Sequence, residues 1–275
     1  MERIKKLYEK CGELTSDISS HHVGAYAAQT AYFLMLSMIP IILLLLTMIK
    51  YTPVTKADVM TAVIQVFPSS VDSLITSIVN QVYNQSMGVV PLTIVVTLWS
   101  AGKGVLALTT GLNCVYKCNE TRNYVILRIR ATVYTVMIIM VVIFLLVLAV
   151  FGNSLNIFIG RHVPLMAEIA DRMLELRSII TPIVMIIFSL IIYKFLPNRK
   201  CKFWSQIPGA VFATIGWMII SWIFSVYVDI FTGFSSMYGS LTTIVLIMLW
   251  MYFCMYSTLL GGEVNMRLEK WVTER

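Results

Sequence analysis

Six long apolar stretches constrain this chain more than any other feature. Each is long enough to cross the hydrocarbon core of a bilayer, which needs about 20 helical residues. Backbone polar groups in lipid must be satisfied within the segment, so each stretch is predicted to be a helix. Hydrophobic residues make up 58% of the 275 residues, which lies outside the usual range of soluble domains. We predict an all-α, polytopic membrane helical bundle with six transmembrane helices over residues 27–49, 89–108, 131–152, 179–196, 208–231 and 239–262.

Lysine and arginine indicate the orientation of this bundle, because cytoplasmic loops carry an excess of these residues. When the loops are assigned alternately to the two sides, one side receives fifteen Lys and Arg residues and the other receives five. Both termini fall on the richer side and are therefore predicted to be cytoplasmic. The first stretch follows a long polar segment and has no cleavage pattern after it, so we do not interpret it as a cleaved signal.

The net charge of +7 is explained by the same loops, since basic juxtamembrane segments are attracted to anionic lipids. The basic residues are dispersed over several short loops and form no nucleic-acid-binding motif. Membrane lipids are therefore the expected partners, and no nucleic-acid partner is expected. The sequence leaves open whether the chain forms a homo-oligomer.

Amphipathic segments lie outside the predicted spans. Residues 1–22 place apolar side chains at helical spacing and predict an interfacial helix on the inner leaflet, while residues 23–275 form the single membrane domain. The segments 55–83 and 164–177 are predicted to be helices on the outer side. They either cap a cavity or rest among the headgroups.

The least ordinary local feature is Lys103, which lies between Gly102 and Gly104 at the inner end of the second span. A cation in or beside hydrocarbon is costly unless it snorkels, pairs or meets water, so it is a candidate functional residue. It either snorkels to the interface or faces a polar cavity, and the flanking glycines, which allow close approach, favour the cavity. The helix is expected to continue beyond residue 108 through Tyr116.

Other polar residues near the inner helix ends complete a hypothetical substrate-binding set. Glu263 is the expected ionic partner of Lys103 or Arg128. Ser100 and Asn113 are expected to line the same site. Pro40 removes one backbone hydrogen bond in mid-membrane and, with Gly102 and Gly104, is a predicted kink or hinge.

Small residues and cysteines give further expectations. Gly209, Ala213 and Gly216 form a stripe suited to close helix packing, and the sixth helix is expected to end at Gly261-Gly262. Cys114 and Cys118 share a helix face without a second pair of ligands nearby, so no metal site is expected. We expect no disulfides, no catalytic residues and no cofactor.

Several motifs together resemble the YihY/BrkB family of bacterial inner-membrane proteins, once labelled ribonuclease BN. They occur in order along nearly the full chain, at residues 28–40, 99–104, 107–108, 112–113, 116, 120–122, 196–199, 208–210, 238–241, 250–252 and 261–265. The resemblance implies a six-span helical protein of the bacterial inner membrane with both termini inside. It implies location more specifically than mechanism, because envelope, lipid-export and transport roles have all been proposed for the family.

Three functions are weighed on these features. The first is a transporter or flippase for an anionic lipid or amphiphile, without a nucleotide-binding motif and hence passive or driven by an ion gradient. The alternative is a non-catalytic structural or assembly factor of an envelope complex. We do not expect ribonuclease activity, because the few histidines and cytoplasmic acids form no metal-ligand or acid–base arrangement.

Overall fold

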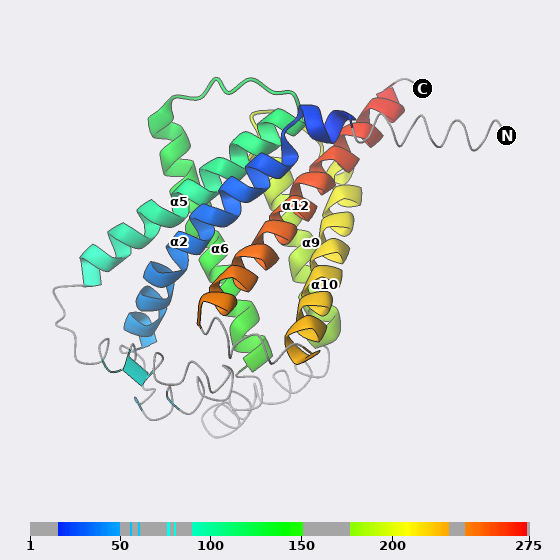
Figure 1. The fold of residues 1–275 in the computed structure, drawn as a ribbon. Helices are drawn as coiled ribbons and strands as arrows, with labels where there is room; N and C mark the ends of the chain where they lie inside the picture. Colours follow the sequence, from blue (N-terminus) through cyan, green and yellow to red (C-terminus); the bar gives the residue numbers. More distant parts are fainter. Residues whose placement is uncertain are drawn as a thin grey trace, which may run out of the picture. The chain divides into compact units, whose positions relative to one another are not determined.

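The computed structural model describes residues 16–49, 90–150, 177–230 and 240–273, together with five isolated positions between 56 and 80. The elements within these ranges are all helical (Figure 1). They are α2 (Val23–Ile49), α5 (Val90–Val115), α6 (Tyr124–Val150), α9 (Arg177–Phe195), the 3-10 helix η3 (Trp204–Gln206), α10 (Ile207–Ile230) and α12 (Ser240–Thr273).

The multi-pass, all-helical prediction is confirmed in the described part of the chain. Five helical segments there are long and apolar enough to cross a membrane: Ile94–Val115, Tyr124–Val141, Ser178–Phe195, Trp204–Val228 and Ile244–Glu269. Helix α2 has 27 residues and covers the predicted first span. The sixth crossing and the orientation of the termini stay predictions. The predicted helices 1–22, 55–83 and 164–177 lie almost entirely outside the described residues, apart from a helical segment at 16–20.

Large apolar side chains are exposed along the helices, as expected where the surrounding medium is lipid. On α10, Trp222 is 67% exposed, and on α6, Met140 is 61% exposed. A soluble domain would bury most of such surface, and exposed apolar patches of this extent mark membrane or protein contact sites. The exposed faces therefore support a membrane environment for the bundle.

Two helix boundaries differ from the predicted ones. Helix α6 begins at Tyr124 instead of residue 131, so its first turns carry Arg128 and Arg130. Helix α12 runs through Gly261-Gly262 to Thr273 instead of ending there. A Cβ atom on Gly261 would lie 2.2 Å from the Tyr193 hydroxyl and 2.6 Å from the Gly209 carbonyl oxygen. Gly261 lets Tyr193 and Gly209 pack closely against α12, and it does not terminate that helix.

The chain forms two compact units. Unit 1 comprises Met1–Met35, Lys103–Ala131 and Met185–Arg275, and unit 2 comprises Leu36–Gly102 and Thr132–Val184. Helices α2, α5, α6 and α9 contribute residues to both units, whereas η3, α10 and α12 belong wholly to unit 1.

Within unit 1, α10 and α12 lie side by side at close range (Figure 1). A Cβ atom on Gly209 would lie 2.1 Å from the Gly261 carbonyl oxygen, and one on Gly216 would lie 2.0 Å from the Ser257 hydroxyl. Ala213, between them on the stripe, is fully buried. The prediction of close packing along this stripe is confirmed. It is reinforced by the Trp217 indole, which donates a hydrogen bond to the Thr258 hydroxyl at 3.0 Å.

Helix α12 also contacts α2, α5 and α9 in unit 1. A Cβ atom built on Gly111 of α5 shows the approach, because it would lie 2.8 Å from Tyr26 of α2 and 3.1 Å from Leu259 of α12. The buried Tyr193 of α9 donates to the Thr258 carbonyl at 2.6 Å. The core of unit 1 is thus built around α12.

In unit 2, α2 continues as helix through Pro40, whose carbonyl accepts a hydrogen bond from the Thr97 hydroxyl of α5 at 2.9 Å. This contact ties the two helices together next to the proline. It is one of the ways in which neighbouring hydroxyls satisfy backbone groups around a membrane-helix proline.

Candidate functional site

Helix α5 ends in a sharp turn that starts the polar end of unit 1. The Cys118 amide donates to the Asn113 carbonyl at 2.8 Å, and the Lys117 amide donates to the Cys114 carbonyl at 3.1 Å. Lys117 has a φ of 54°, in the left-handed region. This is the Schellman arrangement, which satisfies the last carbonyls of a helix and reverses the chain.

Asn113 anchors a clamp between the loop after α5 and the loop after α9. Its side-chain amide donates to Glu120 at 2.8 Å, while its side-chain oxygen accepts from the Asn198 backbone amide at 2.8 Å. Glu120 forms a bidentate ion pair with Arg122, which also donates to the Leu196 carbonyl at 3.0 Å. The hydrogen bonds from Arg122 lower the pKa of Glu120 to about 2. The two loops are therefore held in one fixed arrangement.

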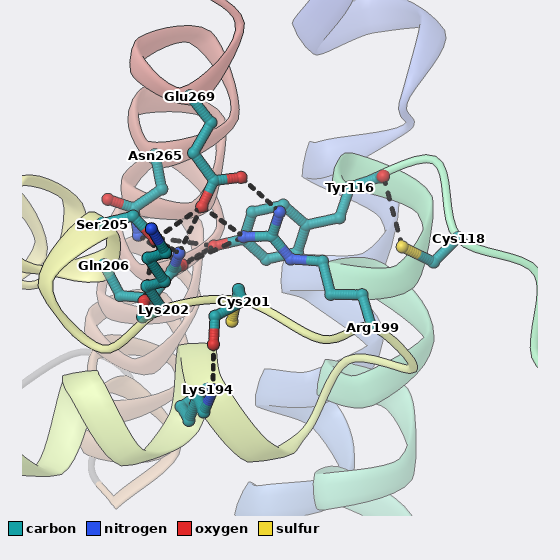
Figure 2. A network of polar contacts seen from close by, with 10 residues as sticks. All are labelled: Tyr116, Cys118, Lys194, Arg199, Cys201, Lys202, Ser205, Gln206, Asn265 and Glu269. Atoms are coloured by element: carbon teal, nitrogen blue, oxygen red, sulfur yellow. Dashed lines mark hydrogen bonds and ion pairs between the residues drawn. The ribbon is translucent and has the colours of Figure 1, made fainter. Parts of the chain in front are cut away.

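A second cluster centres on Arg199 (Figure 2). Its guanidinium lies over the Tyr116 ring, 3.6 Å from the ring centroid, and pairs with Glu269 of α12 at 2.5 Å. Burial, the largest single influence, lowers the pKa of Arg199, but the hydrogen bond to Glu269 and the charges of Glu269 and its other neighbours together raise that pKa above its ordinary value. Burial also raises the pKa of Tyr116, whose hydroxyl donates to the Gln206 side chain at 3.0 Å.

Asn265 connects this cluster to the crossing of α10 and α12. Its side-chain oxygen accepts the Gly209 backbone amide at 2.7 Å, and its amide donates to Gln206 at 3.2 Å. Amides in the first turn of a helix have no partner within it, so Asn265 supplies one for α10. The cluster is therefore a polar cap whose contacts join the end of α5, the loop after α9, η3, α10 and α12.

A third polar group joins the segment ahead of α2 to the last turns of α12. His21 Nδ1 is in short contact with Glu263 Oε1, and both side chains are almost fully buried, with exposed fractions of 6% and 1%. One helical turn away, Arg267 pairs with Asp17 at 2.8 Å in a more exposed position. His22 then ends the segment with a φ of 50°.

The structure places the predicted site residues in different surroundings. Lys103 is exposed, with its ammonium 5.8 Å from the centre of the Phe33 ring. This is the arrangement expected of the snorkelling alternative. Gly104 is packed against Leu34 of α2, where an added Cβ would lie 3.0 Å from that side chain, and Gly102 is buried.

The other predicted residues differ from Lys103 in burial and in their partners. Asn113 is buried in the loop clamp, Ser100 is half-buried in unit 2, and Arg128 is half-buried on α6 of unit 1. Glu263 is paired with His21, which corrects the expectation that Lys103 or Arg128 would be its partner. The carboxylate is in the second half of α12, and the turn at His22 brings the imidazole to it.

Sequence reasoning missed Arg199, Gln206, Glu269 and His21 as members of polar clusters. One signal was present: Asp17 and His21, like Glu263 and Arg267, are four residues apart, which places each pair on one helix face. Acidic and basic residues at the same spacing in two segments predict two side-chain contacts between those segments. Among the residues that the structure describes, no group of three or more His, Cys, Asp or Glu side chains is arranged to hold a metal ion.

Comparison with known proteins adds the family. The family model described as virulence factor BrkB matches residues 14–275. A ribonuclease-like protein of Bacillus subtilis, YfkH, is 35% identical over 94% of both chains. UPF0761 membrane proteins match shorter parts of the chain. One from Idiomarina loihiensis is 31% identical over 31% of this chain and 30% of its own length. One from Nitrosospira multiformis is 33% identical over 29% of this chain and 18% of its own length. No solved structure matches. The full-length match, together with the apolar helices, shows that this chain belongs to the BrkB family of membrane proteins.

Proposed function

We propose that the chain is a transporter or flippase for an anionic lipid or amphiphile in the bacterial cell membrane. The observation that carries the proposal is the division of four helices between two compact units. In α5 the boundary falls between Gly102 and Lys103, inside the predicted hinge. Glycine in a helix costs about 1 kcal/mol relative to alanine and marks a place where a helix bends readily.

Prolines lie near two further boundaries. In α2, unit 2 begins at Leu36, shortly before Pro40, and in α9 it ends at Val184, shortly after Pro182. Proline removes a backbone hydrogen bond and weakens a helix locally. Helices that pass between two units at weakened positions suit a protein whose units move against one another, as transporters do.

Lys103 supports an anionic substrate that approaches from the lipid. It is the first residue of unit 1 on α5, and its ammonium is exposed beside the Phe33 ring. An exposed ammonium is a point charge that attracts phosphate or carboxylate without a dedicated pocket. A lipid headgroup reaches such a position laterally, whereas a water-soluble anion would need a polar cavity.

The proposal includes six spans, with α2 as the first, and cytoplasmic termini. The excess of Lys and Arg on one set of loops supports this orientation. Transport is passive or driven by an ion gradient, because the sequence contains no phosphate-binding loop for nucleotides.

Reconstitution tests the proposal. Purified protein is placed in liposomes with a labelled anionic phospholipid or a labelled zwitterionic one, and movement between leaflets is followed by quenching from outside. We expect faster movement of the anionic lipid than in protein-free liposomes, and slower movement with Gly102→Ala, which stiffens α5. Wild-type protein that leaves the rate at the protein-free level contradicts the proposal.

A second candidate is a non-catalytic structural or assembly factor of an envelope complex. The exposed ammonium of Lys103 is equally consistent with it, because a snorkelling lysine needs no substrate. This function predicts no lipid movement in the liposome assay and unchanged activity in cells carrying Lys103→Ala. The name of the Bacillus relative suggests an RNA-degrading activity, which we do not expect here. Purified protein that degrades RNA, and loses this activity with Glu120→Gln or Glu263→Gln, would overturn that expectation.

A further inference from the structure

We propose that His21 and Glu263 form a binding site for one exchangeable proton, and that this proton drives transport. The driving role rests on the transport function proposed above. The proton site itself rests on the geometry of the pair: an imidazole and a carboxylate in contact, both more than nine-tenths buried, near the end of the candidate span Ile244–Glu269. Buried ionisable groups in membrane helices are functional candidates and often form proton relays.

The hydrogen-bond inventory of the pair leaves room for a proton. His21 Nδ1 and Glu263 Oε1 share one hydrogen bond. Their second polar atoms, His21 Nε2 and Glu263 Oε2, are buried and have no hydrogen-bond partner among the described residues. With a neutral imidazole protonated at Nδ1 and an ionised carboxylate, both of these atoms are acceptors without a donor. Either atom therefore offers a lone pair to which a proton can bind.

The charges around the pair favour the same step. With neutral His21 and ionised Glu263, the pair carries one negative charge in a buried position. The charged neighbours, Asp17 and Arg267, compensate each other in their own ion pair. Tyr26 of α2 and Cys114 of α5, which faces Glu263, bring no positive charge. Uptake of one proton makes the pair neutral overall and removes the cost of a buried charge.

The step is a simple transfer. A hydronium ion gives its proton to His21 Nε2 or to Glu263 Oε2, where a new N–H or O–H bond forms and water is left behind. Release reverses the step, and no electron moves. A metal cation fits less well, because the pair offers only two ligand atoms and the described residues contain no group of three metal-binding side chains.

Proton occupancy changes how strongly two distant segments attract each other. His21 lies ahead of α2, and Glu263 lies on α12. An imidazolium and a carboxylate attract each other more strongly than a neutral imidazole and a carboxylate do. Uptake of the proton at His21 therefore tightens the contact between the segment ahead of α2 and α12, which links proton binding to the conformation of unit 1.

Nuclear magnetic resonance of the full chain in lipid bilayers tests the proton site, with nitrogen-labelled histidine rings and carbon-labelled glutamate carboxyls. Between weakly alkaline and weakly acidic buffer, we expect the signals of His21 or Glu263 to report a proton gained. Glu263→Gln should shift the His21 titration, and His21→Gln should shift that of Glu263. The matched control is the double variant Asp17→Asn/Arg267→Gln, which removes the neighbouring, more exposed ion pair without changing the net charge beside the site and should leave both signals unchanged. Two observations would overturn the site: signals of both residues that stay constant over this range, or a His21 titration that is identical in wild type and in folded Glu263→Gln.

The driving role is tested separately in proteoliposomes with an imposed proton gradient. Wild type and the double variant Asp17→Asn/Arg267→Gln should move labelled anionic phospholipid faster with the gradient than without it, and Glu263→Gln should lose this acceleration. Acceleration that persists in Glu263→Gln overturns the driving role. Wild-type protein that moves no lipid but shows the titration refutes the transport function and leaves the proton site standing.

Discussion

Gly209→Ala should destabilise the contact between α10 and α12. The added Cβ would lie 2.1 Å from the Gly261 carbonyl oxygen and 2.4 Å from the Asn265 side-chain nitrogen. The carbonyl is backbone and cannot rotate away, so α10 must move back from α12. Overpacking of this kind costs about 1–3 kcal/mol.

A weakened hydrogen bond and the helix propensity of alanine also contribute to the change in the free energy of unfolding. Withdrawal of α10 weakens the hydrogen bond from the Gly209 amide to Asn265, now 2.7 Å long, which is worth about 1 kcal/mol. The higher helix propensity of alanine returns up to about 1 kcal/mol. The expected net loss in the free energy of unfolding is therefore about 1–3 kcal/mol.

Two other glycines provide matched controls. A Cβ on Gly216 would meet the Ser257 hydroxyl at 2.0 Å, a side-chain atom that can rotate away, so Gly216→Ala should cost less. A Cβ on Gly24 would find its nearest neighbour, the Tyr252 hydroxyl, at 3.5 Å, an ordinary contact. Gly24→Ala should therefore be neutral or stabilising by up to about 1 kcal/mol.

The assay is equilibrium unfolding in mixed micelles with rising sodium dodecyl sulfate, followed by the helical circular dichroism signal. We expect Gly209→Ala to be the least stable variant and Gly216→Ala to be intermediate, while wild type and Gly24→Ala should be the most stable. Gly209→Ala as stable as wild type, or Gly24→Ala as the least stable variant, would refute the packing argument.

Three other predictions concern the polar end of unit 1 and the topology. Arg199→Lys should lower the free energy of unfolding by about 1–3 kcal/mol in the same assay, because lysine can neither stack flat on the Tyr116 ring nor donate from two nitrogens to the Glu269 carboxylate. An unchanged free energy of unfolding would contradict the stabilising role of the Arg199 cluster. The Arg122 hydrogen bonds hold the pKa of Glu120 at about 2, below its ordinary value of 4.5. These bonds therefore stabilise the folded protein fully above about pH 4.5, and their contribution is lost as the pH falls towards 2. Unfolding at a series of pH values should show this loss in wild type and not in Glu120→Gln. In a chain without its native cysteines, Lys117→Cys should react with a membrane-impermeant thiol reagent only from the cytoplasmic side and Lys56→Cys only from the outside, and the reverse pattern would contradict cytoplasmic termini.

The helices were the predictable part of the fold, because apolar runs of this length have few alternatives in a membrane. The stripe of Gly209, Ala213 and Gly216 was predictable too, since small residues at helical spacing allow close approach wherever a partner exists. The end of α12 was not predictable from the sequence. Gly261-Gly262 has the composition of a helix stop, and only the neighbouring Tyr193 and Gly209 show that these glycines make room for other elements.

The polar contacts were much less predictable, because they join residues far apart in the chain. The sequence predicts Glu263 as the partner of Lys103 or Arg128, and nothing local to it indicates His21. Arg199 was counted only as a loop charge, although Tyr116, Gln206 and Glu269 surround it. Lys103 was ranked highest for its flanking glycines, yet the exposure of its side chain depends on which face of α5 meets α2, which the sequence does not specify.

Pulsed electron paramagnetic resonance tests the motion between the two units on which the proposed transport function depends. Spin labels replace two exposed residues, Val136 in unit 2 and Met218 in unit 1, in a chain without native cysteines. A control pair at Phe212 and Leu249 lies within unit 1. In lipid bilayers we expect two distance populations for the first pair and one population for the control. A single population for both pairs would contradict the proposal.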